Sequence, residues 1–495
     1  MFIFVANMHY KILISNPEEH FITVRWKIKN EFHTKLRVQL PAWRPGRYEL
    51  ANYAKNIRCF TVLNFDGDKI PFKKISKDCW EIDCIQDNDI LVQYEYYANQ
   101  YDAGASFVNE KLLYVNPVNC LMYVVGEMEE PAEIELDIPN DYEIACQLPV
   151  KGKVLFAKNF DELADSPIVA SADLRHFIFE LNHSKIHFWF QGDPCPQMDK
   201  LMSDTKNYAL AQEKLFGDFP CKDYHFLYHI LPTAFSHGVE HTNSTVIAMG
   251  PSSDWAKPEF YDRFLAISSH ELFHLWNVKR IRPQEMLPYD FTKENYSELG
   301  YIYEGVTTYY GDLILLRSGV WNFEQFQTSF NSDLLRHLTN EGRFNYSLAQ
   351  SSFDTWLDGY VPGIKGRKVS IYMEGMLAAM IADIILIKET NGKYRLDDVM
   401  RALYQETYKM GIGYNKEIYK SLLERFSNIS FDDYFCDIID GTGKFEKYLS
   451  LALDTIGLTY IFAPDFEGAD KVRLVKLSHI NDEQAHFFEI WSKKL

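Results

Sequence analysis

The residues best suited to chemistry lie in the segment His270-Glu271-Leu272-Phe273-His274. Two histidines four positions apart on a helix lie on one face, so both imidazoles can reach a single metal ion. A glutamate between them can take a proton from a water held by that metal without being a ligand. A third protein ligand has to come from elsewhere, and a catalytic metal needs its fourth position open. The segment therefore predicts a zinc site with Glu271 as its base.

A second glutamate, Glu304, lies in the later segment Tyr303-Glu304-Gly305. The apolar spacing over 301–317 and the stop at Gly319 predict a helix there. A loop and then a helix antiparallel to the first would bring the Glu304 carboxylate across from the two histidines.

The histidine motif alone leaves an alternative open, because a partly buried helix can carry two histidines that bind only backbone groups. The residues around the two histidines favour a metal site over this alternative, since 266–276 contains no charge except Glu271, as a buried site helix requires. The metzincin continuation is excluded, because it would need glycine at Asn277 and histidine at Arg280.

Composition excludes several classes of partner. The chain has 495 residues and a net charge of −18, which argues against nucleic acid and anionic membranes as partners. The eight cysteines form no CxxC pair, so we expect reduced thiols. The N-terminus lacks the basic region of a secretory signal, and the apolar run 376–387 is too short to cross a bilayer. We therefore expect a cytoplasmic protein; the sequence does not indicate its oligomeric state.

The secondary-structure pattern predicts an α+β multidomain protein. Residues 1–165 indicate an N-terminal antiparallel β domain, 166–320 an α/β catalytic domain with the zinc helix, 321–455 a helical region that completes the cleft, and 456–495 a short tail. The expected strands are 10–14, 21–28, 90–97, 122–125, 177–181, 187–191, 224–231 and 244–249. The expected helices are 197–216, 258–277, 301–317, 323–339, 370–389, 396–409, 415–427, 430–439 and 444–453.

Four segments together resemble the glycyl aminopeptidase family of gluzincin metallopeptidases, and LPAWRPGRY at 40–48 looks like that family's N-terminal β domain. The four segments are GVEHTNST at 238–245, HELFHLWNVKRIRP at 270–283, YEGVTTYYGD at 303–312 and SIYMEG at 370–375. The resemblance covers about 8–460 and implies a thermolysin-like catalytic domain.

The resemblance also implies a role for each site residue. Zn²⁺ would be bound by His270, His274 and Glu304, with Glu271 as the general base. Tyr372 would stabilise the oxyanion, although neighbouring Tyr309 or Tyr310 could supply that donor instead. Glu240 would bind the free α-amino group of the substrate, with a loop-capping carboxylate as the alternative.

Several neighbouring residues have supporting roles in this interpretation. Ser244–Met249 could pair with the substrate backbone as an edge strand. Asp312 could orient a ligand histidine, and the basic residues 279–282 would anchor the end of the zinc helix. For the turn 40–47, a structural role at a domain edge is favoured over a direct role in substrate binding.

The family usually continues into a PDZ domain, whereas here about forty residues follow the last helix, so the tail 456–495 is interpreted as a remnant. The predicted function is a zinc aminopeptidase acting on peptides with a free N-terminus, with a preference for glycine or other small residues that only the resemblance implies. The alternatives are a zinc endopeptidase on the same frame and a non-catalytic peptide-binding scaffold.

Overall fold

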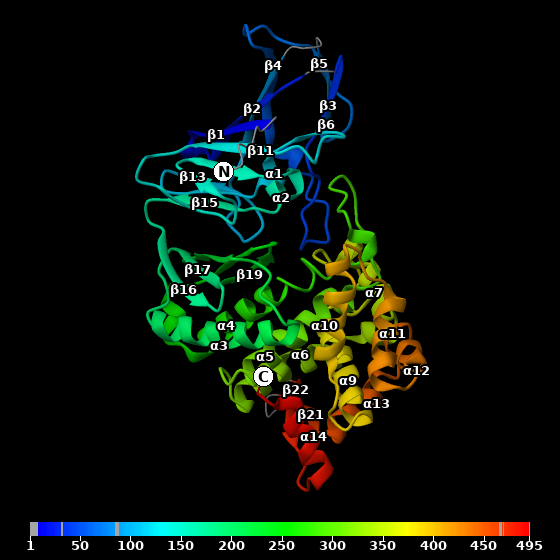
Figure 1. Ribbon diagram of the computed structural model, residues 1–495. Helices are drawn as coiled ribbons and strands as arrows, with labels where there is room; N and C mark the ends of the chain where they lie inside the picture. The colour runs from blue at the N-terminus through cyan, green and yellow to red at the C-terminus, as the bar shows by residue number, and fades with distance from the viewer. Residues whose placement is uncertain (1–7, 31–32, 85–88, 465–467, 469, 495) are drawn as a thin grey trace. The chain divides into compact units, whose positions relative to one another are not determined.

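A computed structural model describes residues 8–30, 33–84, 89–464, 468 and 470–494 (Figure 1). Residues 1–7, on which the expectation of no secretory signal depends, lie outside the described residues. The contacts divide the chain into two compact units. Unit 1 is Met1–Pro196, Cys221–Trp255 and Asp290–Glu294, and unit 2 is Gln197–Pro220, Ala256–Tyr289 and Asn295–Leu495.

Unit 1 begins with a seven-stranded sheet in the order β13-β14-β11-β1-β2-β7-β4. Its strands are β1 (Met8–Asn16), β2 (Phe21–Ile28), β4 (Ile57–Asn64), β7 (Ile90–Tyr97), β11 (Ala132–Asp137), β13 (Val150–Lys151) and β14 (Val154–Ala157). All neighbours are antiparallel except β1 and β11, which run parallel with Met8 opposite Ala132. The alternation of buried and partly exposed residues along β7 shows why this sequence forms a sheet with one apolar face.

Two four-stranded sheets complete the N-terminal region, in the orders β10-β3-β6-β5 and β12-β15-β9-β8. Their strands are β3 (Lys35–Gln39), β5 (Phe72–Lys74), β6 (Cys79–Asp83), β8 (Phe107–Val108), β9 (Leu113–Val115), β10 (Tyr123–Val124), β12 (Glu143–Ala145) and β15 (Ile168–Ser171). Two short helices interrupt these strands in the chain: α1 (Pro117–Cys120) lies between β9 and β10, and α2 (Phe160–Ala164) lies between β14 and β15.

A five-stranded mixed sheet also belongs to unit 1, in the order β16-β17-β18-β20-β19. Its strands are β16 (Arg175–Leu181), β17 (Ser184–Gln191), β18 (Asp223–Ile230), β19 (Phe235–Glu240) and β20 (Ser244–Gly250). Tyr114 and Leu112 of the preceding sheet region share one buried cluster with Leu227, Val239 and Val246 of this sheet. This shared core explains why the contacts group the sheet with the N-terminal strands, whereas the predicted boundary at 165 separates them.

The prediction of an edge strand at Ser244–Met249 is wrong. β20 lies between β18 and β19, parallel to the first and antiparallel to the second. All seven of its residues are buried. The edge is formed by β19, because the chain reverses after Glu240 and pairs β19 along the open side of β20.

Unit 2 is helical. Its α-helices are α3 (Met198–Phe216), α4 (Pro258–Phe273), α5 (Thr307–Arg317), α6 (Phe323–Thr339), α7 (Leu348–Phe353), α8 (Thr355–Asp358), α9 (Met373–Glu389), α10 (Leu396–Glu406), α11 (Lys416–Ser427), α12 (Asp432–Tyr434), α13 (Phe445–Thr455) and α14 (Asp482–Ser492). Two π-helical turns are η5 (Tyr301–Val306) and η8 (Phe435–Ile439). Short 3₁₀ turns of unit 2 are Gln284–Met286, Glu341–Phe344 and Tyr408–Met410; those of unit 1 are Pro17–Glu19, Tyr53–Asn56 and, up to Trp255, Ser252–Ala256.

Local sequence signals account for several helix ends. Pro258 occupies the first turn of α4, where its missing N–H is not needed. Gly217 ends α3 in the left-handed conformation, with φ of 97°. Asn322 and Gln325 form a reciprocal capping box at the start of α6. The predicted helix over 323–339 is confirmed at both ends.

Two glycines let the central helices of unit 2 pack closely. A Cβ on Gly311 of α5 would lie 3.2 Å from the Cβ of His270 on α4. A Cβ on Gly305 of η5 would lie only 2.4 Å from the Cα of Gly375 on α9. The helix that carries Glu304 is therefore held between α4 and α9 by backbone-level contacts.

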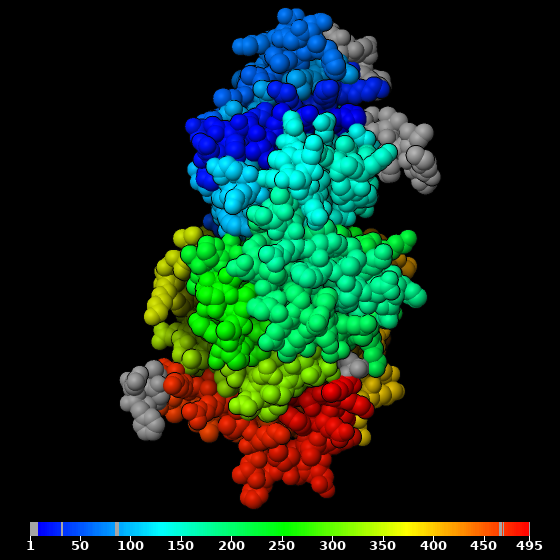
Figure 2. Space-filling view, turned by 90° about the vertical axis from the view of Figure 1, so that its left-hand side faces the viewer, coloured from blue at the N-terminus to red at the C-terminus, as the bar shows by residue number. Residues whose placement is uncertain are grey.

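The C-terminal residues form the hairpin β21 (Leu458–Pro464) and β22 (Asp470–Lys476), followed by α14. Figure 2 shows these red residues packed against the yellow-green residues of α5 and α6. Inside this contact the Arg317 side chain, which is fully buried, donates to the Trp491 carbonyl at 2.7 Å and pairs with Asp397 at 2.9 Å. The indole of Trp491 donates to Tyr309 at 2.9 Å.

The fold class is confirmed as mixed α+β, with largely antiparallel N-terminal sheets followed by a helical region. The predicted division into four segments, with boundaries at 165, 320 and 455, stays a prediction. The eight cysteines lie within the described residues and form no disulfide there. Within the described residues, none of the helices combines the length and apolar character needed to cross a bilayer.

Candidate metal centre

Three side chains of unit 2 bring their ligand atoms together at the end of α4. The Nε2 atoms of His270 and His274 are 3.0 Å apart, and the Glu304 carboxylate lies 3.8 Å from the first and 3.4 Å from the second. The three residues can each offer one atom to a common point, all within 4.8 Å of one another. His274 and Glu304 are buried, and the His270 side chain is 19% exposed. The metal group predicted from the sequence is thus assembled within one compact unit.

The ring of His274 is oriented by the chain that follows α4. The helix ends at Phe273, and His274 is its C-terminal cap. The backbone carbonyl of Asn277 lies 2.7 Å from Nδ1 of His274 and can only accept. Nδ1 therefore carries the proton, and Nε2 presents its lone pair to a metal.

Asn277 also joins the two ligand-bearing segments. Its side-chain amide donates to the Ile302 carbonyl at 2.9 Å and to the Thr307 hydroxyl at 3.0 Å. Both acceptors flank Glu304 in the chain, and Asn277 itself is fully buried. The residue that excluded the metzincin pattern thus ties the exit of α4 to η5.

Glu304 sits within the π-helical turn η5 rather than in a regular α-helix. The sequence predicts one helix over 301–317, but the chain widens for a turn before α5 begins at Thr307. The Thr308 hydroxyl donates to the Glu304 carbonyl at 2.9 Å. Such single π turns often occur at functional sites, because they re-aim one side chain of a helix.

Buried hydrogen bonds next to His270 fix α4 against its neighbouring helices. The Ser269 hydroxyl donates to the Gly311 carbonyl at 2.7 Å, and Gln212 of α3 donates to the Ser269 carbonyl at 2.9 Å. These bonds hold α4 against α5 and α3 one residue before His270. Burial, and to a smaller extent the neighbouring His274, lower the pKa of His270 to about 3. The imidazole is therefore neutral at pH 7, which is the form that binds metals.

The donor set fits zinc. Zinc takes histidine nitrogens at about 2.0–2.1 Å in a tetrahedron, which places ligand atoms about 3.3 Å apart. The separations of 3.0, 3.4 and 3.8 Å bracket that value. Two imidazoles with one carboxylate leave a fourth position for water or substrate, as in catalytic rather than structural sites.

Tyr309 and Tyr310, the two alternatives to Tyr372 as oxyanion donor, each donate a hydrogen bond to a buried aspartate. The Tyr309 hydroxyl donates to Asp383 at 2.6 Å, and the Tyr310 hydroxyl donates to Asp397 at 2.8 Å. Both phenols are buried, and burial raises their pKa well above the usual value. Tyr372 lies at the start of α9, where its carbonyl accepts from Met376 at 2.8 Å. Its role as oxyanion donor stays a prediction.

Glu240 ends β19 in unit 1, so its relation to the metal ligands of unit 2 stays a prediction. Within unit 1 it contacts the turn 40–47, because a Cβ on Gly46 would lie 2.5 Å from Glu240 Oε2. Gly46 has φ of 76°, which favours glycine. Glu240 is 5% exposed, and its Oε1 is buried with no hydrogen-bond partner in the described part of the chain.

Two minor predictions have different outcomes. Asp312 faces α6, where Ser329 and Asp333 are its neighbours, and the Asn277 carbonyl takes the orienting role that we expected of Asp312. Arg280 does anchor the end of the zinc helix, since it donates to the Leu275 carbonyl at 2.7 Å.

The sequence offered no signal for Ser269 or Gln212, because their bonds join segments far apart in the chain.

A mixed α+β chain with two histidines one turn apart and a carboxylate from the next helix has the make-up of a metallopeptidase. Residues 9–172 match the model of the peptidase M61 N-terminal domain, and residues 263–378 match that of M61 glycyl aminopeptidase. Together the two matches cover more than half of the chain. The chain belongs to the M61 peptidase family, and is therefore a zinc metallopeptidase of the aminopeptidase class.

Solved structures share the fold. An aminopeptidase N family protein from Idiomarina loihiensis is 24% identical with a TM-score of 0.88, covering 96% of this chain and 82% of that chain. An M1 zinc metallopeptidase mutant from Deinococcus radiodurans, bound to a Tyr-Ser-Ala substrate, is 12% identical with a TM-score of 0.52, covering 91% and 93%. No curated protein matches the sequence significantly.

Proposed function

We propose that this protein is a zinc-dependent aminopeptidase that removes glycine or another small residue from the N-terminus of peptides. The observation that carries the proposal is the convergence of His270, His274 and Glu304 within 4.8 Å, with Glu271 between the two histidines. The preference for glycine rests on the family match over 263–378.

In this proposal His270, His274 and Glu304 hold the ion. Zinc bound there would lower the pKa of its water towards about 7 and polarise the scissile carbonyl. Glu271, which is 5% exposed, takes the proton of the attacking water and passes it to the leaving amine. Tyr372 donates its phenolic proton in a hydrogen bond to the developing oxyanion, worth about 2.7–4 kcal/mol for comparable single donors.

Glu240 supplies the selectivity for a free N-terminus. A carboxylate that faces an ammonium group forms a charge-assisted hydrogen bond, which an acylated or internal residue cannot make. The buried Glu240 Oε1 without a partner supports this role, because leaving such an atom unpaired costs free energy until a ligand pairs with it. The contact with Gly46 keeps the carboxylate in place.

The test compares glycyl-alanine amide with its N-acetylated form on zinc-loaded protein. We expect hydrolysis of the free amine only, and equal cleavage of both would contradict the aminopeptidase proposal. Glu271→Gln should keep stoichiometric zinc while kcat falls about 10²–10⁴-fold. Glu240→Gln should mainly raise KM for the free amine, so an unchanged KM would remove Glu240 from substrate binding.

A further inference from the structure

A pocket of about 410 Å³ opens in unit 2 beside the segment that carries Tyr372. None of the three metal-ligand residues lines it. Its wall is Asn340, Thr355, Asp358, Gly359 and the continuous segment 362–372. The volume falls in the range of small-molecule and peptide sites, about 300–1,000 Å³.

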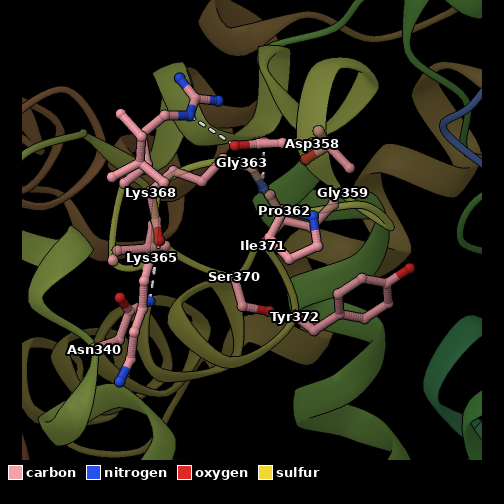
Figure 3. A pocket seen from close by; sticks show the side chains of 15 residues that line it. Asn340, Asp358, Gly359, Pro362, Gly363, Lys365, Lys368, Ser370, Ile371 and Tyr372 are labelled. Carbon is pink, nitrogen blue, oxygen red and sulfur yellow. Dashed lines mark hydrogen bonds and ion pairs between the residues drawn. The ribbon is translucent and has the colours of Figure 1, made fainter.

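The last residues of the pocket wall lead directly into α9, which packs against the segment that carries Glu304. Tyr372 and Ser370 belong to its wall, and the Ser370 carbonyl accepts from the Glu374 amide at 3.0 Å in the first turn of α9. One residue further on, Gly375 lies against Gly305, the neighbour of Glu304. Figure 3 shows Tyr372 at one end of the pocket, with Lys365 and Asn340 at the opposite end.

Most charges in the pocket wall neutralise one another. Arg367 binds Asp358 and Asp354, both at 2.7 Å, and Lys368 lies 3.6 Å from Asp358. Lys365 is exposed and has no hydrogen bond or ion pair with any described residue. The three cations of the wall, Arg367, Lys368 and Lys365, therefore meet Asp358 of the wall and Asp354 beside it, and neither carboxylate forms an ion pair with Lys365.

Exposed apolar residues accompany this charge. Leu357, Val361 and Ile364 are 73%, 72% and 76% exposed, and Ile364 lies in the pocket wall. Leu357 belongs to α8, and Val361 and Ile364 lie in the loop that follows it; three exposed apolar side chains within eight positions indicate a binding surface rather than isolated exposure. A ligand with apolar or backbone character and one carboxylate would match both features.

We propose that this pocket receives the part of the peptide that follows the scissile bond, and that Lys365 binds a carboxylate in that part. The inference rests on the proposed function, because it takes Tyr372 as the residue beside the scissile carbonyl. The chain then runs away from Tyr372 towards Lys365 at about 3.3–3.6 Å per residue. The carboxylate is either the C-terminus of a short peptide or an acidic side chain.

Two pairs of tripeptides distinguish these sources. Gly-Ala-Ala as free acid and as amide tests the terminal carboxylate, and the amides of Gly-Ala-Glu and Gly-Ala-Gln test the side chain. We expect wild-type protein to prefer the carboxylate in at least one pair by about threefold to tenfold in kcat/KM, as a single partly exposed charge-assisted bond allows. In Lys365→Gln that ratio should fall towards one.

The matched control is Lys447→Gln, an exposed lysine on α13 outside the pocket, in which the ratio should stay as in wild type. Equal rates within both pairs for wild type, or a preference that survives Lys365→Gln, would overturn the inference. Binding of the same pairs to Glu271→Gln, measured by calorimetry, gives the same comparison without turnover. If none of the tripeptides is hydrolysed by wild type, the proposed function fails, while calorimetry still decides whether Lys365 binds the carboxylate.

Discussion

Gly305 and Gly375 pack backbone against backbone, because a Cβ on Gly305 would lie 2.4 Å from the Cα of Gly375, and a Cβ on Gly375 would lie 2.7 Å from the Cα of Gly305. The first glycine follows Glu304, and the second lies three residues after Tyr372. The contact therefore sets the spacing between the proposed metal ligand Glu304 and the proposed oxyanion donor Tyr372.

Gly305→Ala should separate η5 from α9 and displace Glu304. We expect a loss of about 1–3 kcal/mol in unfolding free energy, as for other overpacked sites, together with weaker zinc binding. Thermal unfolding and metal analysis measure the two effects. Gly363→Ala is the control for stability and metal content, since a Cβ there meets nothing within 4 Å. Equal behaviour of the two variants would contradict the argument.

Asn277→Ala should weaken metal binding, because it removes both side-chain bonds that tie α4 to η5. Loss of such supporting groups lowers metal affinity about 10–100-fold, which chelator competition can measure. Asn322→Ala removes the cap of α6 instead. It should cost about 1 kcal/mol of stability and leave the zinc affinity unchanged. A similar affinity loss in both variants would mean that general destabilisation is the cause.

The two carboxylates between α5 and α6 predict how stability depends on pH. Burial raises the pKa of Asp312 to about 7 and that of Asp333 to about 6, with Ser329 and Arg336 as their polar neighbours. In the unfolded chain both groups ionise near pH 3.9. The folded state therefore keeps protons that the unfolded state has lost, and stability should fall from about pH 4 to pH 7.

Asp312→Asn should remove part of that fall and stabilise the protein more at pH 7.5 than at pH 5. The gain at the higher pH is of the order of 2 kcal/mol. Urea unfolding at both values measures it, and an identical pH slope in the variant and the wild type would contradict the assignment.

Arg317→Leu should be strongly destabilising, by about 3–5 kcal/mol, because it leaves the buried Asp383 without a cation and Asp397 with Arg395 alone. Changing both aspartates to asparagine in the same protein should recover much of the loss. Arg425→Leu breaks an exposed pair with Glu406, in which both side chains are about half exposed, and should cost at most about 1 kcal/mol. Urea unfolding compares the variants; similar costs for Arg317→Leu and Arg425→Leu would contradict this account.

Local periodicity was sufficient to predict the zinc helix, the helix of Glu304 and the helix over 323–339. It did not predict the π turn at η5, in which Gly305 packs against Gly375 about seventy residues later, because local periodicity carries no information on such distant contacts. The position of Ser244–Met249 inside its sheet could not be predicted for a similar reason, since nothing in that segment itself shows that β19 pairs with its outer side. The charge network of Arg317 joins four distant segments and could be found only in three dimensions.

The bond from Arg317 to the Trp491 carbonyl has a consequence for how the protein is made. A chain still on the ribosome carries both histidines and Glu304 nearly two hundred residues before Trp491 is added. Until then the guanidinium in α5 has only the Asp383 and Asp397 carboxylates as acceptors, and the contact between α5 and α14 is still missing. We therefore expect the packing around α5 to be completed only after synthesis has passed Trp491.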